Sequence, residues 1–300
     1  MRTRITTRGA LALERSRAMD YITLTKPELT FLSVLTALAG YYMGSGGVLE
    51  GAGLIHTLVG TAMVGGGSGA LNQFIERRYD AQMKRTENRP LPSGRIAPAE
   101  ALLFGLFLSC GGILYLAAFV NLLTASLAAA TCVTYLSLYT PLKRLTPIAT
   151  LIGGIPGALP PVMGWTAATN SVGPGALILF GILFFWQMPH FLSLAWIYRR
   201  DYARAGYRLL AVLDTGGGRT AVQALLHTCL LIAVSLLLLA GGGAGMIYGV
   251  CAVVLGAVFV TFAVLLLLRR TSAAARRLFI VSLMYLPALM LAMVLDRVLS

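Results

Sequence analysis

The sequence contains few charged residues, and only a minority of those are acidic. Charged side chains make up 12% of its 300 residues, and Asp and Glu together number 11. Soluble globular domains carry about 25% charged residues. Hydrophobic residues make up 57% of the chain, and the mean hydropathy is +0.79. This composition excludes an ordinary soluble globular protein.

Cysteine is also scarce, and its placement excludes two common uses of thiols. The four cysteines, Cys110, Cys132, Cys229 and Cys251, all lie inside apolar runs. Because the sequence has no Cys-x-x-Cys pair and no His/Cys cluster, neither a disulfide framework nor a zinc site is indicated. The Gly-rich stretch 152–161 lacks a following Gly-Lys-Ser/Thr, so nucleotide binding is not indicated either.

Positive charge is abundant by comparison, since 24 Lys and Arg give a formal net charge of +13. Such an excess is typical of nucleic-acid binders, and also of membrane proteins with basic loops. The apolar runs 102–120 and 225–240 are nearly free of charge. A helix that crosses a bilayer needs about 20 such residues. We therefore predict an all-α polytopic membrane protein, surrounded by membrane lipid, with no nucleic-acid partner.

The apolar windows and the breaks between them predict nine transmembrane helices. We expect residues 1–27 to form a cytoplasmic N-terminal arm, and residues 28–300 to form a single transmembrane domain. The expected helices cover residues 28–45, 53–75, 97–119, 122–140, 147–167, 175–198, 220–240, 244–268 and 276–296.

The cations alternate between the links that join these helices. Twenty-three of the 24 lie in the arm or in the second, fourth, sixth and eighth links, and the last, Arg297, lies near the C-terminus. Basic residues concentrate in cytoplasmic loops of membrane proteins. We therefore expect a cytoplasmic N-terminus and an outer C-terminus, in the inner membrane of a bacterium rather than of a mitochondrion.

A polar strip is predicted at the end of the second helix. Asn72, Glu76 and Asp80 are spaced by four residues, which places their oxygens along one side of a helix. Hard oxygen ligands suit Mg²⁺ that is bound jointly with a diphosphate. A solvated, salt-bridged helix end is the alternative. The apolar surroundings of Asn72 and Glu76 favour a functional site, since unpaired polar groups are costly there.

Basic residues near this strip are candidates for contacts with the phosphate oxygens. Three follow the strip directly, and two lie in the fourth link, where they also serve as a topology signal. The five candidates are Lys84, Arg85, Arg89, Lys143 and Arg144.

A second acidic position, Asp201, follows the sixth helix. It lies eleven residues after His190, so the two share a face if the helix is continuous. The second and sixth helices run in the same direction, which brings Asp80 and Asp201 to the same membrane face. His190 is either a hydrogen-bonded packing residue or a haem ligand, a proton carrier or a substrate contact.

The first motif resembles the acidic signature of UbiA-type intramembrane prenyltransferases. It reads Asn-x₃-Glu-x₃-Asp at 72–80, followed by Met-x-Arg-Thr-x₂-Arg-Pro-Leu at 83–91. The Arg-Thr-x₂-Arg-Pro-Leu tail, and Glu at position 76, resemble the protohaem farnesyltransferase branch of that family. Segments 20–27, 139–165 and 186–206 are similar to that branch as well.

Three features depart from the pattern of that branch. Arg200 stands where the branch has a second acid before Asp201, and Met188 stands where a second proline is usual. The segment 207–211 reads Tyr-Arg-Leu-Leu-Ala instead of continuing as Gly-x-Pro-Met-Leu-Pro from Gly206.

The resemblance implies a UbiA-like bundle around a central cavity that opens to the cytoplasmic side. It also implies transfer of a farnesyl group from farnesyl diphosphate to a vinyl group of protohaem IX, giving haem O. Mg²⁺ would be held by Asn72, Asp80 and Asp201, with Glu76 as a further catalytic residue. Four residues would line the haem or acceptor pocket, and aromatic faces among them would stabilise an allylic cation: Tyr139, Trp186, Gln187 and His190.

Three other functions compete with this one. The first is a prenyltransferase of the same fold with another aromatic acceptor. The second is a proton-coupled transporter, although its charges would lie nearer the membrane midplane. The third is a haem chaperone, which would not need two acidic motifs. For the favoured function, haem A synthase or a terminal-oxidase assembly protein is the expected partner.

Overall fold

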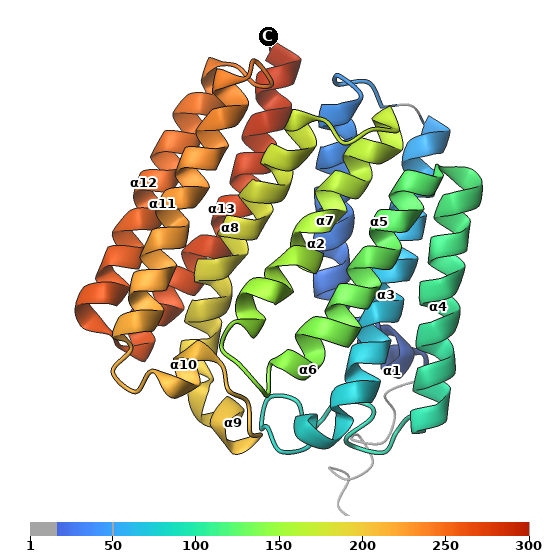
Figure 1. Cartoon of the computed structure of the whole chain (residues 1–300), viewed down its shortest axis with the longest axis vertical. Helices are drawn as coiled ribbons and strands as arrows, with labels where there is room; N and C mark the ends of the chain where they lie inside the picture. The colour runs from blue at the N-terminus through green and yellow to red at the C-terminus, as the bar shows by residue number, and fades with distance from the viewer. Residues whose placement is uncertain (1–16, 50, 300) are drawn as a thin grey trace, which may run out of the picture.

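A computed structural model describes residues 17–49 and 51–299, and within these ranges every regular element is helical, with no strand. Figure 1 shows the long helices running side by side between two ends of the molecule. The predicted all-α class is confirmed.

The described part of the chain holds nine helical rods of 18 residues or more. Three short helices, α1 (Arg17–Leu24), α9 (Arg199–Arg204) and α10 (Leu210–Leu213), accompany them. The rods are α2 (Pro27–Gly44), α3 (Gly51–Asp80), α4 (Pro98–Phe119), α5 (Leu122–Val133) with its continuation through the π-helix η1 (Thr134–Tyr139) and α6 (Thr140–Leu142), α7 (Ala149–Thr169), α8 (Pro174–Ile197), α11 (Gly218–Ala240), α12 (Met246–Arg269) and α13 (Ser272–Leu299).

Seven of these rods, in the described residues, are long and apolar enough to cross a membrane. The two that fall short are α2 and α7. Three prolines in the interior of α7, Pro156, Pro160 and Pro161, lower its mean hydropathy. The chain is therefore a multi-pass membrane protein, and a count of nine spans stays a prediction.

Helices α2 and α7 pack backbone to backbone at the centre of the molecule. A Cβ on Gly40 would lie 1.9 Å from the Pro161 carbonyl oxygen, and a Cβ on Gly164 would lie 1.9 Å from that of Ala37. Small residues allow helices to approach this closely in membranes. The glycines therefore fix the position of α2 beside α7, and with it the position of the residues that precede α2.

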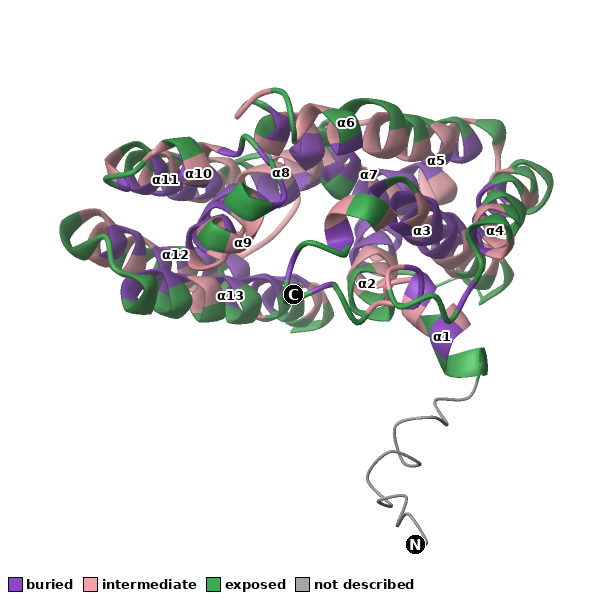
Figure 2. Ribbon diagram, turned by 90° about the horizontal axis from the view of Figure 1, so that it is seen from below, coloured by how far each residue is buried: buried purple, intermediate pink, exposed green. Residues whose placement is uncertain are grey.

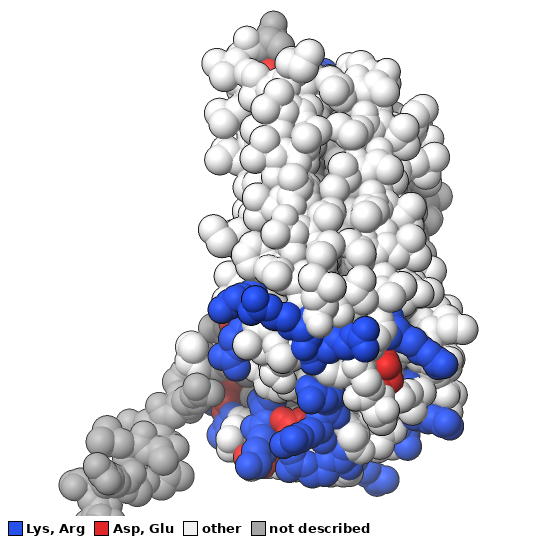
Figure 3. Space-filling model, turned by 90° about the vertical axis from the view of Figure 1, so that its left-hand side faces the viewer, with Lys and Arg blue, Asp and Glu red and all other residues white. Residues whose placement is uncertain are grey.

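The cations gather at one end of the molecule. Figure 3 shows Lys and Arg concentrated in the lower part of the view, with an almost uncharged surface above. Helices α1, α9 and α10 lie at this basic end, and the C-terminus lies at the opposite end (Figure 1). This separation is the pattern that the positive-inside rule produces.

Part of the predicted N-terminal arm packs against the bundle. In α1, the buried Asp20 carboxylate accepts a hydrogen bond from Arg95 at 2.9 Å, and Arg17 donates to Glu100 at 2.7 Å. Residues 1–16 of the expected arm lie outside the described residues. Figure 2 shows α1 beside α2 when the molecule is viewed from the basic end.

The sixth helix ends close to its predicted end at 198, so the continuous helix on which His190 and Asp201 would share a face does not form. Helix α8 ends at Ile197, Tyr198 leaves helical geometry with φ −101° and ψ 17°, and α9 begins at Arg199. The Arg199 guanidinium donates to the Trp196 carbonyl oxygen at 2.8 Å, which satisfies a group left free at the helix end. Asp201 therefore lies on a separate helix.

Candidate active site

The three polar residues predicted on one side of a helix end are buried together on α3. Asn72, Glu76 and Asp80 are 0%, 6% and 1% exposed. We call these three residues the α3 strip. Two carboxylates and an amide at the basic end of an apolar bundle need partners, since an isolated buried charge is very unfavourable. Each residue of the strip has such a partner, contributed by a different segment of the chain.

Asn72 is paired with Lys26, the residue just before α2. The Lys26 Nζ atom donates to Asn72 Oδ1 at 2.5 Å and to the Tyr135 hydroxyl at 3.3 Å. Asn72 Nδ2 in turn donates to Thr140 Oγ1 at 2.9 Å. Burial, followed by the repulsion of Arg89, lowers the pKa of Lys26 to about 7.

Glu76 is paired with Lys143, which follows α6. The Lys143 Nζ atom lies 2.5 Å from Glu76 Oε1, and the same oxygen accepts a hydrogen bond from the Tyr207 hydroxyl at 3.0 Å. Burial lowers the pKa of Lys143, but Glu76 and the neighbouring tyrosines Tyr139, Tyr207 and Tyr135 together outweigh burial and hold the pKa well above its ordinary value. Lys143 also lies over the Tyr139 ring, 4.7 Å from its centroid.

Asp80 is paired with Arg89 in the loop after α3. Arg89 Nη1 lies 2.9 Å from Asp80 Oδ2, and the Thr86 hydroxyl donates to the Asp80 carbonyl oxygen at 2.8 Å. These two contacts fold the 81–97 loop back over the end of α3. The α3 strip is therefore covered by cations from three segments of the chain, one of which is the loop that follows α3.

The other predicted cations lie around this core. Arg85 donates to the Tyr202 hydroxyl at 2.9 Å, and the Arg144 guanidinium lies over the Tyr79 ring, 4.1 Å from its centroid. Lys84 is exposed to solvent. Of the five predicted cations, Lys143 and Arg89 thus pair with the α3 strip, and in the described part of the chain the other three form no hydrogen bond or ion pair with it.

The second acidic position lies close to the first motif without joining it. Asp201 forms an ion pair with Arg204 of its own helix, and within residues 17–49 and 51–299 no hydrogen bond or ion pair links Asp201 to the α3 strip. Tyr207 supplies the connection between the two regions instead. Its ring lies 5.6 Å from that of Tyr202 and 6.3 Å from that of Tyr79.

The donor set of the α3 strip fits a hard divalent cation. Carboxylate and amide oxygens are the ligands that Mg²⁺ takes from proteins, usually one or two carboxylates with phosphate oxygens and water. Among the residues that the structure describes, no group of three or more His, Cys, Asp or Glu side chains could hold a metal ion by itself. The strip therefore suits a metal shared with a phosphate ligand better than a closed protein site.

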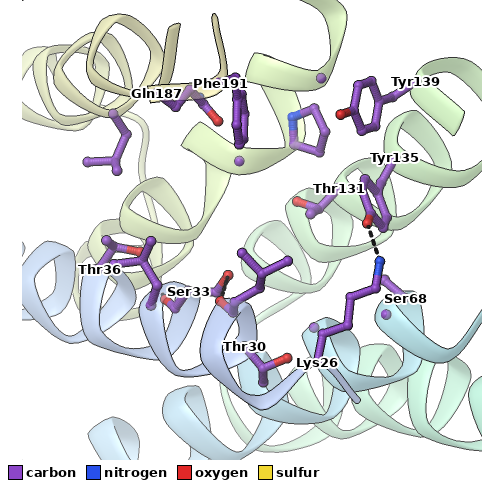
Figure 4. A pocket seen from close by; sticks show the side chains of 18 of the residues that line it. Lys26, Thr30, Ser33, Thr36, Ser68, Thr131, Tyr135, Tyr139, Gln187 and Phe191 are labelled. Atoms are coloured by element: carbon purple, nitrogen blue, oxygen red, sulfur yellow. Dashed lines mark hydrogen bonds between the residues drawn. The ribbon is translucent and has the colours of Figure 1, made fainter. Parts of the chain in front are cut away.

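A cavity of about 230 Å³ lies next to the strip, between α2, α3, η1, α7 and α8. Figure 4 shows Lys26 and Tyr135 joined at one side of this central cavity. A row of hydroxyl groups, Thr30, Ser33 and Thr36, lies along α2. Most of the remaining lining is apolar or aromatic. The cavity thus has a charged end and an apolar interior.

The predicted acceptor residues line the same cavity. Tyr139, Trp186, Gln187 and His190 all face it. The Trp186 indole donates to the Ser282 carbonyl oxygen at 2.8 Å, and the His190 ring stacks on Trp186 with centroids 5.2 Å apart.

The hydrogen bonds of His190 define its neutral tautomer. The Ser282 hydroxyl donates to the Phe279 carbonyl oxygen at 2.6 Å, so it accepts from His190 Nδ1 at 2.9 Å. The proton therefore sits on Nδ1, and Nε2 keeps its lone pair.

Sequence reasoning missed three residues that complete the site: Lys26, Tyr135 and Tyr207. Lys26 lies 46 residues before Asn72, and Tyr207 lies 131 residues after Glu76. A single cation directly before an apolar helix was the available signal for Lys26. No local pattern marks Tyr207, which stands in the segment that departs from the usual signature.

These features define a class of protein: a membrane-embedded helical bundle whose basic end holds a polar strip over an apolar cavity, suited to a ligand with an anionic head and an apolar tail. The chain belongs to the UbiA prenyltransferase family, whose pattern matches residues 33–288.

Curated relatives cover almost the whole chain. The "Protoheme IX farnesyltransferase" of Salinibacter ruber is 48% identical over 277 residues, which is 92% of this chain and 98% of the relative. The protein of the same name from Solibacter usitatus is 44% identical over 287 residues, covering 93% of this chain and 98% of the relative.

Solved structures share the fold at low sequence identity. Digeranylgeranylglyceryl phosphate synthase gives a TM-score of 0.80 at 17% identity, with 95% of this chain and 99% of that chain covered. A UbiA homologue from Aeropyrum pernix gives 0.71 at 19% identity, with 90% and 98% covered. The predicted UbiA-like fold is confirmed.

Proposed function

We propose that this protein transfers the farnesyl group of farnesyl diphosphate to a vinyl group of protohaem IX, which yields haem O and diphosphate. One observation carries the proposal: the α3 strip and its three cations lie at the charged end of a cavity whose interior is apolar and aromatic. The relatives named for this reaction, at 44–48% identity over almost all of the chain, support the choice of substrates.

The reaction requires no nucleophile from the protein. The bond between the allylic carbon and the diphosphate oxygen breaks, and the diphosphate leaves with the electron pair. The π electrons of the vinyl group form the new carbon–carbon bond. A water molecule then adds to the resulting cation and releases a proton, which leaves a hydroxyl group. The apolar cavity excludes water from the allylic cation until that bond has formed.

The charged end of the cavity acts on the leaving group. Lys143, Arg89 and Lys26 lie on the α3 strip, where they would neutralise the charge that develops on the departing diphosphate. Arg85, Arg144 and Lys84 would contribute from the surrounding loops. Positive groups that are fixed in a water-poor site stabilise such a charge far better than the same groups in water.

Mg²⁺ is the metal that we propose for the site, with Asn72, Asp80 and Asp201 as its protein ligands and Glu76 beside them. Bound there with the diphosphate, it would supply additional positive charge to the leaving oxygens. A UbiA homologue from Archaeoglobus fulgidus was solved with GPP and Mg²⁺, which supports this class of ligand.

Aromatic and polar side chains would receive the acceptor. Tyr139 and Trp186 offer ring faces that attract an allylic cation. Gln187 donates to the Gly154 carbonyl oxygen at 2.7 Å, which fixes its amide against α7. The lone pair on His190 Nε2 makes the proposed role of that residue as a haem contact chemically reasonable.

We also propose an orientation and a location. The basic end of the bundle would face the cytoplasm and the C-terminus the opposite side, in a bacterial inner membrane, because cytoplasmic loops retain Lys and Arg. Haem A synthase or a terminal-oxidase assembly protein would receive the product.

Asp80→Asn tests the assignment of the α3 strip. The substitution keeps the size of the side chain and an oxygen for Arg89, but it removes the negative charge from the proposed metal site. We expect farnesyl transfer to fall at least about 100-fold. Asp296→Asn is the matched control: Asp296 is also buried, at 3% exposure, but it lies at the opposite end, where it accepts hydrogen bonds from the Gly245 and Tyr248 backbone amides. Normal turnover in Asp80→Asn would contradict the assignment.

A further inference from the structure

A second cavity, of about 620 Å³, lies outside the central one. Its two walls are the first turn of α7 with the residues before it, and the first half of α11. Its floor is α8, which packs against both of these helices. Figure 2 shows α8 between α7 on one side and α10 and α11 on the other. We call this cavity, which two helices border above a common third helix, the slot.

The walls of this slot are mainly apolar. Pro147, Ile148 and Leu151 form one side, Val222 stands on the other, and Leu192 lies on the floor. Pockets of 300–1,000 Å³ with apolar walls and a few convergent polar groups are typical sites for small ligands. The central cavity, which takes the prenyl chain in the proposed reaction, is smaller, at about 230 Å³.

One wall carries a histidine in the orientation that metal-ligating histidines use. His227 is 7% exposed and lines the slot. Its Nδ1 atom lies 2.7 Å from the Gln223 carbonyl oxygen. A carbonyl only accepts, so Nδ1 carries the proton and Nε2 keeps its lone pair. Nε2 has no hydrogen-bond partner among residues 17–49 and 51–299, and a backbone acceptor on the other ring nitrogen is the usual support of a metal-bound imidazole.

A cation stands at the basic end of the same wall. Arg219 lines the slot eight residues before His227, which is about 12 Å along a helix. Arg219 is exposed in the first turn of α11, where it also serves as a topology signal, and its guanidinium is free to pair with a carboxylate at this end of the slot. A lipid acyl chain would interact with neither the imidazole lone pair of His227 nor the guanidinium of Arg219. A flat ligand with a metal at its centre and carboxylates at one edge would use both.

We propose that this slot is a binding site for an iron porphyrin, with the iron on His227 Nε2 and the propionates toward Arg219. It rests on the proposed function, since protohaem is the acceptor of that reaction, and it adds a docking site outside the central cavity. Two segments separate the slot from the α3 strip: Pro147 follows Lys143 by four residues, and Leu210 follows Tyr207 by three. A porphyrin in the slot would therefore be bound next to the segments that form the diphosphate site.

The chain contains three histidines, which makes the test decisive. Full-length protein in detergent is titrated with ferric protohaem, and the Soret band reports imidazole ligation. His227→Ala is expected to lose the imidazole signature and to raise the Kd at least tenfold. His56→Ala is the matched control, because His56 lines neither cavity, and it is expected to keep both. Added imidazole should restore the signature in His227→Gly, which a variant that merely misfolds would not show.

A second experiment repeats the protohaem titration with the central cavity occupied. A non-hydrolysable farnesyl diphosphate analogue should leave protohaem on His227, because the two ligands bind in different cavities. If the signature survives in His227→Ala and disappears in His190→Ala, the porphyrin binds centrally and the slot is only a lipid site. The proposed function then stands and the inference is wrong. If the wild-type protein neither binds protohaem nor farnesylates it, both are wrong.

Discussion

The ion pair between Lys143 and Glu76 gives the sharpest prediction about how the site is held together. Lys143→Met keeps most of the side-chain volume but removes the charge 2.5 Å from Glu76 Oε1. The carboxylate, 6% exposed, would then keep a single hydrogen-bond donor among the residues that the structure describes, the Tyr207 hydroxyl. The free energy of unfolding should therefore fall steeply.

The size of this loss follows from burial. Removing one partner of a buried ion pair costs about 3–5 kcal/mol, because the other charge is left uncompensated. Exposed pairs contribute about 0–1 kcal/mol. The side chains of Lys143 and Glu76 are 12% and 8% exposed, which places the pair in the first class. The double variant Lys143→Met with Glu76→Gln should regain most of the loss, since the glutamine oxygen still accepts from Tyr207.

Reversible unfolding in mixed micelles measures this cycle, with farnesyl transfer recorded for each variant. The expected result is a destabilised Lys143→Met and a stable double variant, both with strongly reduced activity. Stability and activity would thus separate in the double variant. If Lys143→Met lost less than about 1 kcal/mol, the pair would be effectively solvated, and the site as described here would be wrong.

Three further predictions concern single features of the molecule. Tyr207→Phe removes one hydrogen bond to the Glu76 carboxylate and should destabilise the protein by about 1.5–3 kcal/mol, measured by the same unfolding assay; an unchanged stability would mean that this bond does not form. Lys26→Met should raise the KM for farnesyl diphosphate while Lys26→Arg retains most of the affinity, and equal values in steady-state assays would remove Lys26 from the site. Gly164→Ala should lower the yield of folded protein, because the new Cβ would lie 1.9 Å from the Ala37 carbonyl oxygen; normal detergent stability would contradict the backbone contact between α2 and α7.

The features that depend on neighbouring residues could be predicted from the sequence. Apolar runs separated by Gly, Pro and charged residues predict the helices, since the period and length of a run are local properties. The spacing of Asn72, Glu76 and Asp80 predicts one polar side of α3 for the same reason. The alternating cations predict that one end of the molecule is basic, as the structure confirms.

The remaining parts depend on contacts between distant segments. Lys26 meets Asn72 because Gly40 and Gly164 let α2 pack closely on α7, and no pattern near position 26 reveals that contact. The end of the sixth helix was predicted within one residue, but the sequence has no proline or glycine near Tyr198 to indicate that a second helix, α9, begins at Arg199. Tyr207 reaches Glu76 through a turn at Gly206, where φ is +75°.

The central claim is the identity of the two substrates. Purified full-length protein is incubated with protohaem, farnesyl diphosphate and Mg²⁺, and 4-hydroxybenzoate is added as a competing acceptor. Mass spectrometry then identifies the products. The account predicts one porphyrin product that has gained a farnesyl group and a hydroxyl group, and an unmodified benzoate. A prenylated benzoate together with unchanged protohaem would contradict it.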